Sequence, residues 1–108
     1  MEELISGIPA SCGTFSGKVR IVRSLEEGMK LQEGEILVTK CTDPGWMDLL
    51  FKAGAVATAS GGMLSHPAII CRELSKPAIV GLTEKVFELL NDGMEVLVDG
   101  NKGTIFKI

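Results

Sequence analysis

The pattern of apolar and polar residues predicts short strands separated by short helices. Polar and apolar residues alternate from Gly17 to Arg23, which is the two-residue period of a half-buried strand. Two more strands are predicted in the tail, on either side of a hairpin turn at Asp99–Gly103. Three further apolar runs have the length of strands, namely Glu35–Lys40, Gly54–Thr58 and Ala78–Gly81.

Helix signals lie between the predicted strands. Ser24, Asp43–Pro44 and Thr83 are each typical of a helix start, and the stretch from about Ser65 to Leu74 predicts a longer helix that ends before Pro77. Strands that alternate with short helices indicate an α/β domain with a layered or partly closed sheet. The 108 residues suit one domain, so we treat 1–108 as a single unit.

Composition and charge exclude several classes of protein. With 45% hydrophobic and 23% charged residues, the chain has the balance of a soluble globular domain. It has no apolar run near the roughly 20 residues that span a bilayer, and no leader pattern, so we expect a cytoplasmic protein without a membrane partner. The net charge of −3 and the scattered basic residues argue against nucleic-acid binding. The three cysteines show no metal-binding spacing, so no metal site is predicted.

Candidate chemistry is concentrated in the segment Thr58–Ala68. A predicted strand leads into Gly61 and Gly62, and these lead into a helix start that carries the only histidine, His66. Glycines let the backbone bend tightly and let an outside group approach main-chain N–H groups. The first N–H groups of a helix favour an anion, and Ser65 is placed either to cap the helix or to donate its hydroxyl to that anion.

His66 is therefore the candidate nucleophile for a phosphoryl group. Neutral imidazole is a fair nucleophile near pH 7, and histidine forms covalent intermediates. A metal ligand is disfavoured because the chain has no second histidine and no acidic residue near His66 before Glu73. Glu73 should return to the histidine's face of the helix, whereas Arg72 should point elsewhere, and both are possible supporting residues.

The longest motif is GGMLSHPAIICREL at 61–74, followed by KPAIVG at 76–81. Together with Gly7–Ser11 near the start and Val98–Gly100 near the end, it resembles the mobile, or swivelling, phosphohistidine domain of phosphoenolpyruvate-utilising enzymes. That family includes pyruvate phosphate dikinase, phosphoenolpyruvate synthase, Enzyme I of the sugar phosphotransferase system and rifampicin phosphotransferase. The likeness covers nearly the whole chain.

The resemblance implies a compact β/β/α swivelling domain whose catalytic residue is His66. The histidine would take a phosphoryl group from ATP on a nucleotide-binding partner, or from phosphoenolpyruvate on a barrel partner, and pass it on. Gly61, Gly62 and Ser65 would form the phosphate cradle, and Thr58 matches the threonine that opens the family motif. The chain alone would bind no cofactor. Mg²⁺ with ATP, or phosphoenolpyruvate, is expected on ATP-binding and phosphoenolpyruvate- or pyruvate-binding domains or subunits, in cis or in trans.

Some positions depart from the family pattern. Leu64 stands where the dikinase and Enzyme I branches usually have threonine, and it looks more like the synthase-like and antibiotic-modifying branches. Ala59 and Pro67 replace residues that are usually polar and small, respectively, and Cys12 stands where proline is common. None of these changes removes the candidate nucleophile.

Three other functions stay open at this point. The same fold can serve as a non-catalytic interaction or regulatory module, because fold does not fix function. Cys71 and His66 are candidates for a small Cys/His hydrolase, although no third orienting group is evident. The helix start can also bind an anion without any chemistry.

Overall fold

The strands are joined in the order β1-β8-β7-β3-β4-β5-β6-β2, which places segments from both ends of the chain beside each other. The computed structural model describes residues 1–108. Its strands are β1 (Glu2–Ser6), β2 (Ile8–Ser11), β3 (Thr14–Ile21), β4 (Ile36–Thr39), β5 (Ala55–Thr58), β6 (Ala78–Val80), β7 (Glu95–Asp99) and β8 (Thr104–Lys107). Its helical segments are α1 (Leu25–Gly28), η1 (Pro44–Trp46), α2 (Met47–Lys52), α3 (His66–Leu74) and α4 (Val86–Leu89).

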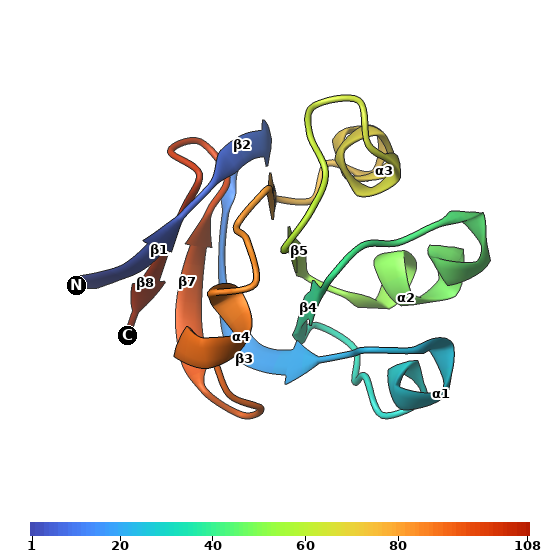
Figure 1. Ribbon diagram of the computed structural model, residues 1–108, viewed down its shortest axis with the longest axis horizontal. Helices are drawn as coiled ribbons and strands as arrows, with labels where there is room; N and C mark the ends of the chain where they lie inside the picture. Colours follow the sequence, from blue (N-terminus) through green and yellow to red (C-terminus); the bar gives the residue numbers. More distant parts are fainter.

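The sheet divides into two layers at β3 (Figure 1). Residues 14–18 of β3 pair antiparallel with β7, whereas residues 19–21 pair parallel with β4. Strands β4, β5 and β6 continue the parallel layer, and β2 closes it in the antiparallel direction. In Figure 1, β1, β8 and β7 lie on one side of the parallel strands, and α1, α2 and α3 lie on the other. This β/β/α arrangement confirms the α/β class expected from the sequence.

Side chains of the parallel strands alternate between two hydrophobic cores. Leu37 and Val56 face the core shared with α2 and α3, whereas Val38 and Ala57 face the core shared with β7 and β8. Successive residues of a strand point to opposite faces, so both faces of these strands are covered. Burial on both faces explains why β4 and β5 read as continuous apolar runs in the sequence. Burying each large side chain stabilises the fold by about 1.5–3 kcal/mol.

The predicted central elements are confirmed with small shifts of their ends. Strands β4, β5 and β6 lie within the three apolar runs, α3 matches the longer predicted helix, and β7 and β8 form the predicted hairpin. Strand β3 begins earlier than predicted, at Thr14. Strand β1 was not predicted: its only partner is β8 at the far end of the chain, and its residues are exposed or half-buried.

Two of the three short helix starts are confirmed by their caps. The Ser24 Oγ accepts a hydrogen bond from the Glu27 N–H at 3.2 Å, and the Asp43 Oδ1 accepts one from the Gly45 N–H at 2.8 Å. Helix α4 begins at Val86, three residues after the predicted start, although the Thr83 Oγ1 accepts a hydrogen bond from the Lys85 N–H at 3.4 Å as a cap would. The Thr83 N–H donates to the Ala59 carbonyl oxygen at 2.8 Å, which ties this residue to the end of β5. No helix in the structure has both the length and the apolar character needed to cross a bilayer.

Thr83 provides a test of this local geometry. Its φ of +70° lies in the left-handed region, which costs a β-branched residue about 1–2 kcal/mol. We expect Thr83→Gly to raise the free energy of unfolding by about 1 kcal/mol, despite the greater entropy of glycine in the unfolded chain. The control Thr14→Gly, in strand β3, should lower it by a similar amount. Urea unfolding measures the free energy of unfolding of both variants. Equal destabilisation by the two substitutions would contradict a strained conformation at Thr83.

The cysteines provide a second test. Cys71 lies on the buried side of α3, and burial raises the pKa of its thiol to about 11, whereas Cys12 and Cys41 are exposed. Because the thiolate is the reactive form, iodoacetamide at pH 8 should label two cysteines in the native chain and three in denaturant. Cys71 should react at least about 100-fold more slowly than the other two in the native state. Peptide mass analysis measures the labelling rate of each cysteine. Similar rates for all three cysteines in the native chain would show that Cys71 is not buried.

Candidate phosphohistidine site

His66 is the first residue of α3, directly after the loop that leaves β5. Ser65 occupies the N-cap position with extended backbone angles, and Pro67 fits the first helical turn because no intrahelical acceptor is lost there. The imidazole is half-buried, whereas Pro67 and Ala68 behind it are buried. The N–H groups of His66 and Ala68 belong to the first turn, where a helix provides no acceptors and carries the positive end of its dipole. The predicted helix start is therefore confirmed.

Thr42 fixes one side of the imidazole ring. Its Oγ1 lies 2.8 Å from Nδ1 of His66, which is hydrogen-bonding distance. Either atom can be the donor, depending on which ring nitrogen carries the proton. This hydrogen bond engages Nδ1 and leaves Nε2 as the ring nitrogen that Thr42 does not contact. Thr42 was not predicted as a site residue, because it lies 24 positions before His66 on a different loop.

Parallel pairing of β4 with β5 brings these two loops together. Thr39 and Thr58, the last residues of the two strands, lie opposite each other. Beyond them, both the N–H and the hydroxyl of Ser60 donate to the Lys40 carbonyl oxygen, at 3.0 and 2.8 Å. The buried Thr58 hydroxyl donates to the Ser60 carbonyl oxygen at 2.7 Å. Thr58 is thus a residue that holds the loop, and the loop of Thr42 leaves the sheet beside the loop of His66.

The three predicted phosphate-binding residues lie together in the turn before His66. Gly61 has a φ of +103°, and a side chain there would bring Cβ within 2.9 Å of the Ser65 Oγ, so the turn requires glycine at this position. Gly62 has open space around it. The Gly62 carbonyl oxygen accepts from the Ser65 N–H at 3.1 Å and from its hydroxyl at 2.7 Å. Ser65 therefore closes the turn rather than capping α3 with its side chain.

Arg72 holds this loop from the other end of α3. Its Nε donates to the Ala10 carbonyl oxygen in β2 at 2.8 Å, and its terminal nitrogen donates to the Met63 carbonyl oxygen. The guanidinium thus links β2 to the loop before His66, a role that helical periodicity alone does not reveal. Glu73, expected on the histidine's face, is exposed and forms no ion pair.

Neither Cys71 nor a cluster of ligands adds to the site. The Cys71 side chain is fully buried, and its raised pKa keeps the thiol protonated, so the geometry gives no support to the Cys/His hydrolase. No three His, Cys, Asp or Glu side chains come together as they do around a metal ion.

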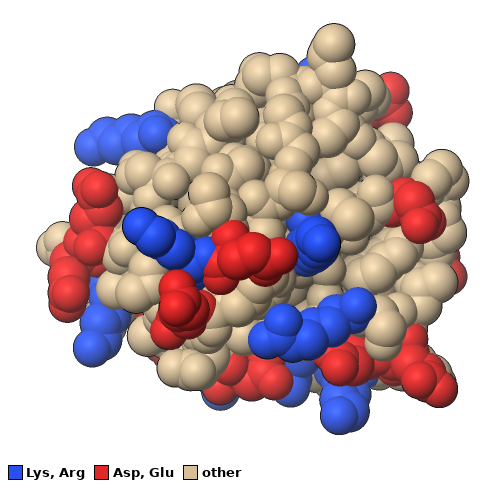
Figure 2. All heavy atoms as spheres, viewed as in Figure 1, with Lys and Arg blue, Asp and Glu red and all other residues tan.

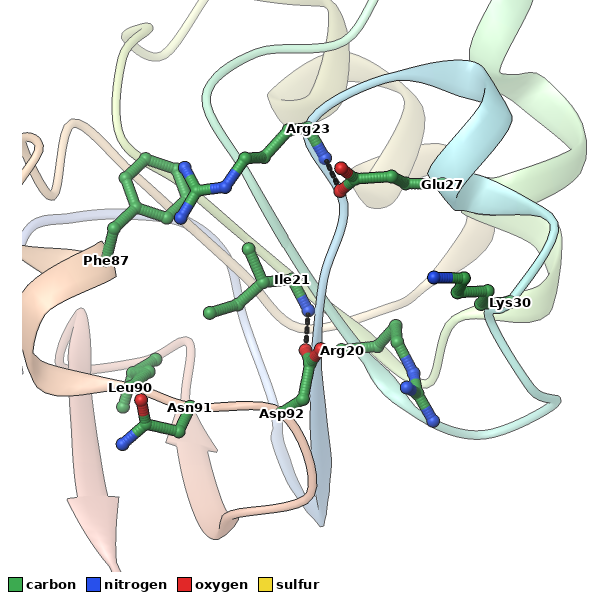
Figure 3. Close-up of a pocket in the computed structure, with 9 residues that line it drawn as sticks. All are labelled: Arg20, Ile21, Arg23, Glu27, Lys30, Phe87, Leu90, Asn91 and Asp92. Carbon is green, nitrogen blue, oxygen red and sulfur yellow. Dashed lines mark hydrogen bonds between the residues drawn. The ribbon is translucent and has the colours of Figure 1, made fainter.

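A hollow of about 380 Å³ lies elsewhere, between α1, the end of β3 and the turn after α4 (Figure 3). There the Arg23 guanidinium lies 4.6 Å from the ring centre of Phe87. The Asp92 Oδ1 accepts from the Ile21 N–H at 2.6 Å, and the Glu27 Oε1 accepts from the Arg23 N–H at 2.9 Å. None of the predicted site residues lines this hollow. Asp92 thus fastens the turn after α4 to the end of β3, and Glu27 fastens α1 to the residues between β3 and α1.

Comparison with known proteins places this geometry in a family. The family model described as the mobile domain of PEP-utilising enzymes matches residues 31–103. Phosphoenolpyruvate synthase of Aeropyrum pernix is 45% identical over 106 residues, which cover 97% of this chain and 13% of that protein. Rifampicin phosphotransferase of Bacillus cereus is 40% identical over 103 residues, which cover 95% of this chain and 12% of that protein. This chain therefore spans about an eighth of the length of these relatives.

Solved structures share the fold of this chain. The solution structure of an Enzyme I protein has a TM-score of 0.60 and 30% identity, and the match covers 73% of this chain and 32% of that one. Aconitase X of Thermococcus kodakaraensis shares the fold alone, with a TM-score of 0.68 over 96% of this chain and 97% of that one, at 17% identity. The family model and the relatives cover the strands, the loop and the helix that build the His66 site, and the chain belongs to the family of mobile domains of PEP-utilising enzymes.

Proposed function

We propose that this chain is a phosphohistidine carrier that accepts a phosphoryl group on Nε2 of His66 and transfers it between active sites on partner domains or proteins. The observation that carries the proposal is the 2.8 Å contact between Thr42 Oγ1 and Nδ1 of His66, at the start of α3. It orients the ring and engages the nitrogen that does not react. The Nε2 atom is then available to a group that approaches from outside the domain.

Each half of the transfer follows from the chemistry of imidazole. In the neutral ring, the proton lies on Nδ1 and is donated to Thr42, so the lone pair of Nε2 attacks the phosphorus atom of the donor. The N–P bond forms as the P–O bond of the donor breaks, and the leaving oxygen keeps that electron pair. In the second half, an acceptor oxygen attacks phosphorus and the N–P bond electrons return to Nε2. The Nδ1–H···O hydrogen bond is kept throughout.

The turn before His66 supports an anion at this position. The positive end of the α3 dipole stabilises a nearby negative charge by about 0.3–1 kcal/mol at an exposed site. Gly62 has open space around it, so an outside group can approach the main chain of the turn there. The Ser65 hydroxyl, which donates to the Gly62 carbonyl oxygen, would turn toward a phosphoryl group on the neighbouring His66. We assign Gly61, Gly62 and Ser65 to phosphate binding, with Thr58 and Arg72 holding their loop.

The names of the relatives support a shared carrier step with different acceptors. One relative is a phosphoenolpyruvate synthase and another is a rifampicin phosphotransferase, yet both match nearly the whole of this chain. A carrier domain common to both fits a step in which His66 holds the phosphoryl group and another domain selects the acceptor. We place ATP with Mg²⁺, or phosphoenolpyruvate, on those partner domains, and we place the reaction in the cytoplasm, where both compounds are available.

The carrier role is tested by intact-mass analysis of wild type and His66→Ala. Each is incubated with extract of the source cells and either ATP with Mg²⁺ or phosphoenolpyruvate, then analysed at neutral or alkaline pH. We expect one added phosphoryl group on wild type, absent from the variant and lost in acid, because a phosphorus–nitrogen bond is acid-labile. If wild type gains no phosphoryl group in an extract that labels a dikinase control, the chain is instead a non-catalytic module on the same fold.

The role of Thr42 is tested by the position of the imidazole proton. Long-range ¹H–¹⁵N spectra distinguish a ring protonated at Nδ1 from one protonated at Nε2. When the His66 imidazole of wild type is neutral, we expect its proton on Nδ1, from which it is donated to Thr42. Thr42→Val removes this acceptor and should shift the ring toward the tautomer that is protonated on Nε2. Thr42→Ser keeps the hydroxyl and should behave as wild type. A wild-type proton on Nε2 would contradict the proposed direction of this hydrogen bond.

A further inference from the structure

The hollow between residues 20–30 and residues 87–92, which we call the β3 hollow, lies at the carboxyl end of β3. From β3 the chain passes through α1 to the parallel strand β4 on one side, and after β6 it returns through α4 to β7 on the other side of β3. In α/β sheets, small molecules bind outside the carboxyl ends of strands at such a change of direction. The volume of about 380 Å³ is within the range of small-molecule sites.

The walls of the β3 hollow are fixed by contacts within the chain. The Asp92 carboxylate is bonded to the Ile21 N–H, and the Glu27 carboxylate is bonded to the Arg23 N–H. The Arg23 guanidinium lies over the Phe87 ring, which orients its N–H groups. Groups that are already oriented lose little conformational freedom when a ligand binds.

Two of the three cations at the β3 hollow have no acidic partner. Arg20 is paired with Glu35 through hydrogen bonds of 3.1 and 3.0 Å, and this is the only ion pair in the structure. Arg23 and Lys30 line the hollow and belong to no ion pair. Their charges are therefore available to an anion that enters from solvent.

Across the β3 hollow the charges run positive, negative, positive. Figure 3 shows Arg23 on one side, Lys30 on the opposite side and the Asp92 carboxylate between them. The Ile21 N–H occupies Oδ1 of Asp92, so its other oxygen can accept a hydrogen bond from a ligand. Figure 2 shows charges of both signs intermingled over α4, the end of β3 and α1, whereas the surface near β2 carries few. A ligand that matches this order carries two anions with a cation between them.

We propose that the β3 hollow binds an acidic α-amino acid, with one carboxylate on Arg23, the other on Lys30 and the ammonium group on Asp92. All three contacts are charge-assisted hydrogen bonds, which are roughly twice as strong as neutral ones. A simple diacid or inorganic phosphate lacks the positive group that Asp92 requires. The site is separate from that of His66, because α3 lies beyond β4 and β5 from the hollow (Figure 1). It therefore does not rest on the proposed carrier function.

The amino-acid site is tested by isothermal titration calorimetry at low ionic strength, where exposed charges are least screened. The chain is titrated with L-glutamate and L-aspartate, and with glutarate and succinate, which are the same diacids without the ammonium group. Lys30→Gln removes one cation, and Asp92→Asn removes the anion but keeps an oxygen that can accept from the Ile21 N–H. The control Lys102→Gln removes an exposed cation at the opposite end of β7. Thermal unfolding confirms that the variants are folded.

Wild type should bind at least one of the two amino acids at a single site, with a Kd of about 1 mM or lower. Lys30→Gln and Asp92→Asn should each weaken this binding about tenfold or more, whereas Lys102→Gln should stay within about twofold of wild type. The matching diacid should bind wild type about tenfold more weakly than the amino acid, and Asp92→Asn should not weaken it further, because the diacid has no ammonium group to lose its partner.

Three results would overturn the amino-acid site. The first is the absence of binding of either amino acid to wild type at about 10 mM. The second is equal affinity of wild type for the amino acid and its matching diacid, which needs no variant to fold. The third is unchanged affinity in Lys30→Gln.

Discussion

The parallel register of β4 and β5 is the constraint on which the site depends. Because Thr39 lies opposite Thr58, both strands end at the same edge of the sheet, and the loops that follow them leave side by side. Ser60 then joins the two loops through its hydrogen bonds to the Lys40 carbonyl oxygen. A shift of one residue in this pairing would separate Thr42 from His66 and would also turn the apolar side chains of β5 to the wrong faces.

The layered fold makes that edge rigid. Two hydrophobic cores cover both faces of the parallel strands, so the ends of β4 and β5 are fixed by packing on each side. His66 is held at this edge, in a turn closed by its own hydrogen bonds and by Arg72. This placement supports the proposed carrier role, because the domain could present His66 to another active site without rearranging its own core.

The sequence predicted those features that follow from local patterns. The sequence reveals β4, β5, β6 and α3 because apolar runs and helix-start signals depend only on residues that are adjacent in the chain. Strand β1 was missed because its partner is β8 at the far end of the chain. Thr42 was missed as a site residue because its contact with His66 depends on strand register, and the clamp formed by Arg72 depends on the path of the loop.

The most direct test of the central claim is the identity of the phosphorylated nitrogen. ¹⁵N-labelled wild type would be phosphorylated with source-cell extract and examined by long-range ¹H–¹⁵N and ³¹P spectroscopy at alkaline pH. The geometry predicts a single adduct on Nε2 of His66, with Nδ1 still hydrogen-bonded to Thr42. An adduct on Nδ1 would contradict this mechanism, because the phosphoryl group would then occupy the position of the Thr42 hydroxyl.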